Sequence, residues 1–348
     1  MVRLLDPEKL AGGTERREDL ARVRRVVWRR WALQGLSVTL AVLCAWLVLL
    51  FTGGLAWERD AIETVARPAI ASAPALPKVA PVLPEVAPGF DAEELRGRLE
   101  EIAEEHEGVY GVAVLEPVSG TRVSLRGDEE FMAASIGKLP TLAALYRAAA
   151  RGEIDLDEEI SLLPDDIQAY DSGGLNGFSL DYSMSLRECA YRLVNYSDNT
   201  AWTMLDRRLG EEKIRAELES AGIENSSYSG YLSGYYTTPS DVLLLLEKIS
   251  DPQYTSEELS AEMLDAMTET SVEDRIPEKL PQDVRVAHKT GSYDDNFGDA
   301  GIVFYRDYRG DEKRYYLVVL ASGTGEYEAR DAIQEMSLAV YEALLYPS

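Results

Sequence analysis

The sequence predicts a mixed α/β fold of the α+β type, in which an antiparallel sheet is flanked by helices and is preceded by an N-terminal transmembrane helix. Strand-like stretches occur at both ends of residues 90–348, and the middle third between them has helical spacing. The sheet must therefore be assembled from both ends of this region, with a helical subdomain inserted between its strands. A ligand cleft is expected where the two layers meet.

The first 57 residues have the composition of a membrane anchor. Residues 31–57 contain no charged side chain, and about 20 apolar residues suffice to span a bilayer. Tryptophans stand at both ends, and five arginines crowd residues 22–30, at the end of the preceding tail, residues 1–30. The positive-inside rule places this basic tail in the cytoplasm and the rest of a single-pass membrane protein outside. A cleaved signal peptide is the alternative, but the apolar run is too long for a typical signal core.

The composition of residues 58–89 predicts a spacer, because six prolines occur among alanines and valines between positions 61 and 89. In an extended conformation of about 3.1 Å per residue, this spacer could reach about 90 Å from the membrane. The folded unit, residues 90–348, begins after it. Cys44 falls within the predicted span and Cys189 in the outer domain, so we expect neither an intrachain disulfide nor a thiolate metal site.

The charge is unevenly distributed along the chain. The net charge is −26, and residues 90–348 alone hold 23 basic against 52 acidic side chains. Such a surface repels polyphosphates and argues against a nucleic-acid partner. The sequence does not indicate the oligomeric state.

Within residues 90–348 each element has its own signal. A helix with an aspartate cap is followed by two short strands that a Ser-Gly turn joins. A capping box, Ser185 with Glu188, opens the first of several helices in the middle third. Strands return near the C-terminal end, and a helix closes the chain. These segments are 91–106, 109–116, 121–127, 185–194, 201–209, 211–222, 239–250, 284–291, 300–307, 314–322 and 327–345.

Three short strings carry candidate chemistry. Residues 133–140, AASIGKLP, open an Ala- and Leu-rich helix with an unfavourable Gly and Pro, and place Ser135 and Lys138 on one helix face. Ser197-Asp198-Asn199 follows a helix, and Lys289-Thr290-Gly291 ends a strand. Each string is weak alone, but their order and their placement on these elements make a strong combination.

S-x-x-K, S-D-N and K-T-G together are the signature of class A β-lactamases and penicillin-binding proteins, and this chain resembles that family over residues 90–348. VNYSDNTAW, TTPSD and VAHKTGS resemble further family segments. The resemblance implies a β-lactamase/transpeptidase-like fold with a five-stranded antiparallel sheet and an all-helical subdomain. It also implies a β-lactam or D-Ala-D-Ala-like small substrate, no cofactor and no metal.

The chemistry of acyl transfer explains the first residues of the set. Ser135 is the candidate nucleophile and needs a neutral base, which Lys138 supplies if burial and the nearby cation of Lys289 disfavour its charged form. Ser197 would relay protons to the leaving nitrogen. Asn199 would hold both the substrate amide and Lys138.

The remaining candidates bind substrate. Lys289, Thr290 and Ser292 suit a substrate carboxylate, by charge and by hydroxyl donors. Gly291 would let the substrate lie along the strand edge. The backbone N–H groups of Ser135 and Ser292 would form the oxyanion hole, each worth about 3 kcal/mol.

A Ser-His-Asp triad is disfavoured. His106 lies at the charged end of a surface helix, and His288 directly precedes Lys289 on a strand, so its side chain points to the opposite face.

The family pattern breaks at one point. Class A β-lactamases carry an E-x-x-L-N string whose Glu activates the deacylating water. The corresponding interval of this chain, residues 222–239, lacks this string, and Glu224 is its only carboxylate residue. Three interpretations follow. The first is a membrane-anchored, extracytoplasmic serine hydrolase of class A type that releases its acyl group slowly or uses another base. The second is a D,D-peptidase or esterase that acts on peptidoglycan-like substrates, and the third is a non-turnover penicillin-binding or cell-wall-sensing module. The first is our preferred interpretation.

Overall fold

The structure is a computed structural model, and it describes residues 91–230, 235–268, 270–307 and 309–345. The predicted basic tail, transmembrane helix and linker, residues 1–30, 31–57 and 58–89, lie outside these described residues. None of the helices in the described ranges has both the length and the apolar composition that a membrane span needs.

A five-stranded sheet contains strands from both ends of the described chain, as the sequence predicts. All neighbours are antiparallel, and β1 from the N-terminal side pairs directly with β10 from the C-terminal side. The order across the sheet is β2 (Thr121–Leu125), β1 (Val109–Glu116), β10 (Glu312–Ser322), β9 (Asn296–Arg306) and β8 (Arg285–Tyr293).

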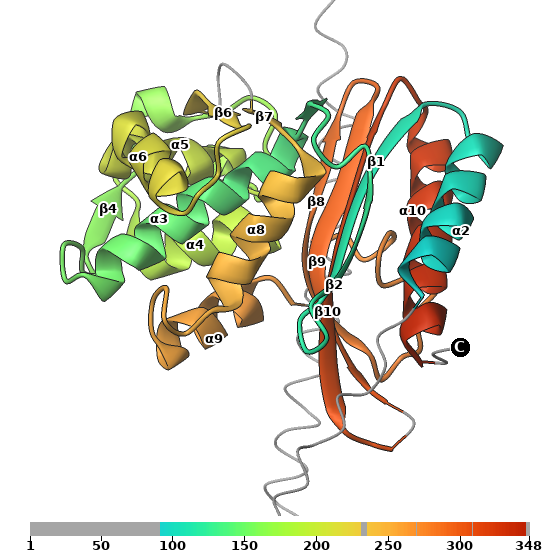
Figure 1. Cartoon of the computed structure of the whole chain (residues 1–348). Coiled ribbons are helices and arrows are strands. Elements are labelled where there is room, and N and C mark those ends of the chain that lie inside the picture. The colour runs from blue at the N-terminus through green and yellow to red at the C-terminus, as the bar shows by residue number, and fades with distance from the viewer. Residues whose placement is uncertain (1–90, 231–234, 269, 308, 346–348) are drawn as a thin grey trace, which may run out of the picture. The chain divides into compact units, whose positions relative to one another are not determined.

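Two helices cover one face of this sheet, and the helical subdomain covers the other (Figure 1). On the first face lie α2 (Ala92–Glu105) and α10 (Glu326–Leu345). Asp91 caps α2 by accepting hydrogen bonds from the next backbone N–H groups, and Leu95, Leu99 and Ile102 are buried against the sheet layer. The two faces therefore have separate apolar cores.

The helical subdomain is built around a buried central helix. Nearly every residue of α3 is buried, which agrees with an Ala- and Leu-rich helix surrounded on several sides. Ser185 accepts a hydrogen bond from Glu188 N at 3.1 Å at the start of the next helix, as its capping signal predicts. The helices are α3 (Lys138–Ala150), α4 (Leu186–Asn195), α5 (Asn199–Leu209), α6 (Glu211–Ser220), α8 (Pro239–Ser250) and α9 (Glu257–Ala266).

The expectation that this subdomain is all helical is wrong in detail. Short extended segments between the helices satisfy their backbone groups by pairing with one another. One ladder joins β4 (Glu159–Ser161) to β5 (Ser183–Ser185), and a second has the order β3 (Phe131–Met132), β7 (Tyr235–Thr237) and β6 (Ser227–Tyr228).

Strand β8 lies at the edge of the sheet next to the helical subdomain. Its first half is covered, because Thr268 forms an isolated bridge with Ala287 and His288 N donates to Met267 O at 2.8 Å. Its second half faces η2 (Ala134–Gly137), a 3₁₀ turn that precedes α3. The two layers therefore meet where the S-x-x-K and K-T-G strings lie.

Asp166, at the end of η3 (Pro164–Asp166), ties this turn to α5. Its buried carboxylate accepts from Nε and Nη2 of Arg207, both at 2.8 Å, and from Leu163 N at 2.8 Å. We expect Asp166→Asn to lower the free energy of unfolding by about 2 kcal/mol, because it weakens charge-assisted hydrogen bonds in a buried place. Urea unfolding measures the loss.

The matched control is Glu312→Gln, which removes an exposed partner of Arg306. Exposed ion pairs contribute little, so a loss below about 0.5 kcal/mol is expected. Equal losses in the two variants would contradict the assigned role of Asp166.

Candidate active site

Ser135 lies in the 3₁₀ turn η2, which directly precedes the start of α3 at Lys138. The preceding Ala134 has φ 48°, a conformation that a non-glycine residue adopts at a cost of roughly 1 kcal/mol. Such strain is typical of functional sites, since the surrounding packing must hold it. Pro140 is the third residue of α3, where no helical N–H donor is required, so the helix tolerates it. The sequence places the serine correctly at a helix start, but the first turn is 3₁₀.

Lys138 is fully buried, and its amine contacts three groups. Nζ lies 2.8 Å from Ser135 Oγ and 2.7 Å from Asn199 Oδ1, and it stands 4.6 Å from the centroid of the Trp202 ring. The structure therefore joins the S-x-x-K and S-D-N strings at one amine.

Burial of this amine favours its neutral form. Burial, and then the charge of Lys289, hold the pKa of Lys138 well below its ordinary value. The carboxylates of Asp198, Asp171 and Asp206 oppose this shift without outweighing it. Burial also lowers the pKa of Lys289 to about 7; Asp299 opposes this shift and Arg275 adds to it. A neutral Nζ can accept the proton of Ser135 Oγ, which is the chemistry required of a base.

Asn199 is the first residue of α5 and is held from two sides. Its Nδ2 donates to Tyr170 O at 2.6 Å, and its backbone N donates to Asp171 Oδ1 at 2.9 Å. Its amide oxygen is thereby turned toward Lys138. The loop that contains Tyr170 and Asp171 thus positions the S-D-N string, which the sequence did not indicate.

Asp198 caps α5 and shares its surroundings with Asp171. Its side chain accepts from Ala201 N at 2.8 Å, and its other carboxylate oxygen has no hydrogen-bond donor among the described residues. Burial and the neighbouring Asp171 raise the pKa of Asp198 to about 6. The Asp of S-D-N is therefore structural, as a buried cap beneath Asn199.

Ser197 has φ 55°, the second strained residue of the site. In the described chain, no hydrogen bond joins its hydroxyl to Lys138 or Lys289. The amine of Lys289 donates instead to Thr290 O at 2.9 Å. The proton relay assigned to Ser197 thus remains a prediction.

Strand β8 brings the K-T-G string against η2. A Cβ on Gly291 would stand 2.5 Å from Ala133 O, so only glycine lets the strand come this close to the turn that holds Ser135. Lys289 and Thr290 are buried, whereas Ser292 is exposed. Of the predicted substrate-binding residues, Lys289, Thr290, Gly291 and Ser292 therefore lie on one strand beside the serine, whereas Asn199 lies on α5.

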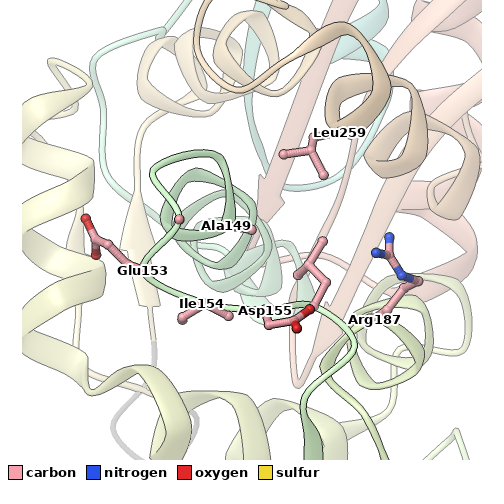
Figure 2. A pocket seen from close by; sticks show the side chains of 8 residues that line it. Ala149, Glu153, Ile154, Asp155, Arg187 and Leu259 are labelled. Carbon is pink, nitrogen blue, oxygen red and sulfur yellow. The ribbon is translucent and has the colours of Figure 1, made fainter.

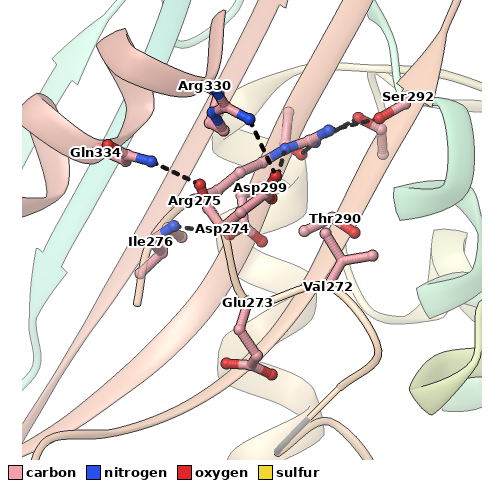
Figure 3. Close-up of polar contacts among 12 residues, drawn as sticks. Val272, Glu273, Asp274, Arg275, Ile276, Thr290, Ser292, Asp299, Arg330 and Gln334 are labelled. Atoms are coloured by element: carbon pink, nitrogen blue, oxygen red, sulfur yellow. Dashed lines mark hydrogen bonds and ion pairs between the residues drawn. The ribbon is translucent and has the colours of Figure 1, made fainter. Parts of the chain in front are cut away.

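Arg275 is a candidate that sequence reasoning missed. Its buried guanidinium donates to Gly291 O at 2.6 Å, to Gly298 O and to Ser292 Oγ (Figure 3). It brings a second cation to the part of β8 predicted to bind a carboxylate. An arginine within DRIPEKLP carries no local signal of this contact, because the contact depends on how the α9–β8 segment crosses the sheet edge.

His288 lies behind the site, on the side of β8 that the alternation predicted. Its Nδ1 is 2.9 Å from Asp299, and its Nε2 is 3.3 Å from Glu273. Neither ring nitrogen contacts Ser135. This placement argues against a Ser-His-Asp triad.

Glu224, the carboxylate in the interval without E-x-x-L-N, is exposed. Within the described ranges, no carboxylate forms an ion pair or a hydrogen bond with Lys138 or Ser135. The structure therefore assigns no obvious base to a deacylating water.

A surface pocket of about 410 Å³ lies elsewhere, at the C-terminal end of α3 (Figure 2). Ala149 and Arg187 are among its lining residues, and Arg187 is already paired with Asp157 and Glu262. It contains none of the predicted site residues, and α3 separates it from Ser135 by about 20 Å at 1.5 Å per residue.

The chain is similar to known proteins in sequence and in fold. The model of the β-lactamase enzyme family matches residues 94–344. A curated β-lactamase of Proteus vulgaris is 30% identical over 109 residues, which are 31% of this chain and 40% of that protein. The chain thus spans less than half the length of this curated relative.

Solved structures match over a longer range. PBP-A superimposes with a TM-score of 0.68 at 26% identity, covering 74% of this chain and 98% of PBP-A. A mutant of PBP-A, solved as an acyl-enzyme complex with penicillin-G, gives a TM-score of 0.67 at 25% identity over 74% of this chain and 98% of its own.

The His288–Asp299 pair makes a prediction about pH. Burial disfavours the imidazolium, but Asp299 and Glu273 outweigh it and raise the pKa of His288 to about 9. An unfolded His titrates near 6.5, so this stabilisation is complete below about pH 6.5 and is lost as the pH rises through about 9. His288→Asn keeps an N–H donor, but its side chain does not take up a proton in this pH range. We expect the stability advantage of the wild type over this variant to shrink between these pH values.

Urea unfolding at pH 6, 7.5 and 9 measures this difference. Comparing the two proteins at each pH cancels the titration of Lys289, which acts in the opposite direction. A difference that stays constant across the range would contradict a charged His288.

Proposed function

Because the chain belongs to the β-lactamase enzyme family, we propose that it is a serine acyl-transfer enzyme in which Ser135 forms an acyl-enzyme with β-lactams. The observation that carries this proposal is the 2.8 Å contact between Ser135 Oγ and the buried amine of Lys138. A hydroxyl beside a neutral, desolvated amine is an activated nucleophile.

In the acylation step, Lys138 takes the proton of Ser135 as Oγ attacks the lactam carbonyl. The backbone N–H groups of Ser135 and Ser292 would stabilise the developing oxyanion. The leaving nitrogen needs a proton, and Lys138 would pass on the one it took from Ser135 through the hydroxyl of Ser197, which would receive that proton as it donates its own. Asn199 would bind the substrate amide while it holds Lys138 at 2.7 Å.

The substrate carboxylate would bind at the end of β8. Lys289 supplies a cation and Thr290 a hydroxyl, and the guanidinium of Arg275 stands behind Ser292. A carboxylate approaching Lys289 would favour its ammonium form, since opposite charges raise the pKa of a lysine. Substrate binding would thus strengthen its own anchor.

Release of the acyl group is expected to be slow. A deacylating water needs a base within about 3 Å, and the described residues place no carboxylate at Ser135 or Lys138. The similar PBP-A mutant was captured as an acyl-enzyme with penicillin-G. The same machinery would also serve a D,D-peptidase or esterase, with a D-Ala-D-Ala-like peptide as acyl donor, or a penicillin-binding cell-wall sensor without turnover.

Membrane anchoring forms part of the proposal. The uncharged run of residues 31–57 and the arginines before it support a single-pass protein with its enzymatic domain outside the cytoplasm. Protease protection of the full chain in sealed vesicles tests this topology.

Fluorescent penicillin labelling of the full chain tests the reaction. We expect Ser135→Ala to abolish labelling and Lys138→Ala to reduce its rate by at least about 100-fold, because the first removes the nucleophile and the second its base. Lys279→Ala is the matched control, since this lysine pairs with Glu335 on the surface and should label normally.

Three results separate the interpretations. Label that persists for hours supports slow deacylation, whereas rapid loss of label with nitrocefin turnover supports an efficient lactamase. No label on the wild type would overturn both enzymatic interpretations in the stated form. Full labelling of Ser135→Ala would refute its role as nucleophile.

Glu224 gives a separate prediction. Because its side chain is exposed and no contact of the described structure joins it to Ser135, Glu224→Gln should leave the lifetime of the acyl-enzyme unchanged. The fraction of acylated protein, followed by intact mass after excess penicillin is removed, measures this lifetime. A clear lengthening would identify Glu224 as the deacylating base.

A further inference from the structure

Trp202 lies against the amine that would activate Ser135. The centroid of its ring is 4.6 Å from Lys138 Nζ, and its Cη2 would stand 3.2 Å from a Cβ built on Gly137. The indole therefore lies beneath the first turn after the nucleophile. The side chain is 5% exposed, so the ring is itself shielded from solvent.

The ring is fixed in place by a polar network on its far side. Its Nε1 donates to Tyr228 Oη at 2.9 Å and lies 3.1 Å from Thr141 Oγ1. Both hydroxyls lie within hydrogen-bond distance of Asp206 Oδ1, Tyr228 at 2.6 Å and Thr141 at 2.9 Å. A buried network of this kind locks the orientation of the indole.

Three directions around the amine of Lys138 are occupied by protein groups. Its amine bonds to Ser135 Oγ and Asn199 Oδ1, and the indole face covers a third direction. An aromatic face attracts a cation but does not hold a water in hydrogen-bonding geometry. The side of the amine that faces Trp202 is thus covered by an apolar ring.

We propose that Trp202 is a positioning residue that keeps water away from Lys138 and thereby prolongs the acyl-enzyme. This inference rests on the proposed function. Hydrolysis of the acyl-enzyme forms a bond from a water oxygen to the acyl carbon and breaks the bond to Ser135 Oγ. One water proton passes through a base to Oγ, and the acid leaves. The ring denies this water a site beside the amine.

Removing the ring should admit water because the groups behind it are polar. Trp202→Ala would open a cavity next to Lys138 that is lined by the hydroxyls of Tyr228 and Thr141 and the carboxylate of Asp206. Polar cavities of this size hold water when it finds two to four partners. A water held by these groups would take the place of the ring on this side of the amine.

The test measures the lifetime of the penicilloyl form of the full chain by intact mass after removal of free penicillin. We expect Trp202→Ala to shorten this lifetime by at least about tenfold, which is less than the roughly 100-fold that a well-positioned base contributes at minimum. Trp202→Phe retains an aromatic face and should restore most of the lifetime. Tyr305→Ala creates a large cavity in the other apolar core and is the control for destabilisation away from the site. It should leave the lifetime unchanged.

Loss of a buried Trp can unfold a protein, so folding is checked by thermal unfolding and a second variant is included. Trp202→Gln keeps a side-chain amide that can bond to Tyr228 and can also bind water. It should shorten the lifetime as Trp202→Ala does. An unchanged lifetime in a folded Trp202→Gln or Trp202→Ala would overturn the inference.

The pH profile of acylation gives a readout that a purely structural role would not move. Burial is the largest cause of the low pKa of Lys138, whereas the ring as a cation–π partner acts in the opposite direction. Admission of water should therefore move the acid limb of the acylation rate to higher pH in Trp202→Ala. A shift to lower pH would show that the ring acts as a cation–π partner and would contradict water exclusion.

These outcomes distinguish this inference from the proposed function. A wild type that never forms the penicilloyl adduct refutes the proposed function. An adduct that forms normally but has the same lifetime in every folded variant refutes only the role of Trp202.

Discussion

The burial of one amine is the constraint on which the site depends. Lys138 has no exposed surface and no ion pair within the described ranges, and a charged lysine in that situation would cost several kcal/mol. Burial lowers the pKa of this amine, which favours its neutral form, and Ser135 and Asn199 lie within 2.8 Å of it. The charge of the buried Lys289 acts in the same direction. Desolvation disfavours the ammonium form of this lysine, and the same effect makes the neutral amine available as a proton acceptor.

The fold maintains this burial by bringing distant segments together. Strands from both ends of the described chain complete the sheet, and this places β8 against η2. The contact is close enough that Gly291 has no room for a Cβ, and it holds Ala134 at a positive φ. Strain before Ser135 and at Ser197 is offset by the packing of the surrounding layers. Stability in the core thus maintains unfavourable conformations at the site.

Local signals were sufficient to predict much of this arrangement. Ser135 and Lys138 are one turn apart, and His288 and Lys289 are adjacent on a strand, so their relative directions follow from helical and strand periodicity. Arg275 and Trp202 could not be assigned in this way. The guanidinium reaches Ser292 only because the α9–β8 segment crosses the sheet edge, and the indole is oriented by Thr141 and Tyr228, which belong to other elements. The short ladders of the helical subdomain were missed for a similar reason, because two or three extended residues carry no periodicity.

The Thr268–Ala287 bridge has a consequence for self-association. An open sheet edge is a template on which a second molecule can add a strand. Here a neighbouring segment occupies the first half of β8, and η2 packs against its second half, where Lys289, Thr290 and Gly291 are buried. Little of the outer backbone of this edge strand is therefore open to strand addition by a second molecule. The packing that brings the K-T-G string to Ser135 thus also protects the sheet against edge-to-edge association.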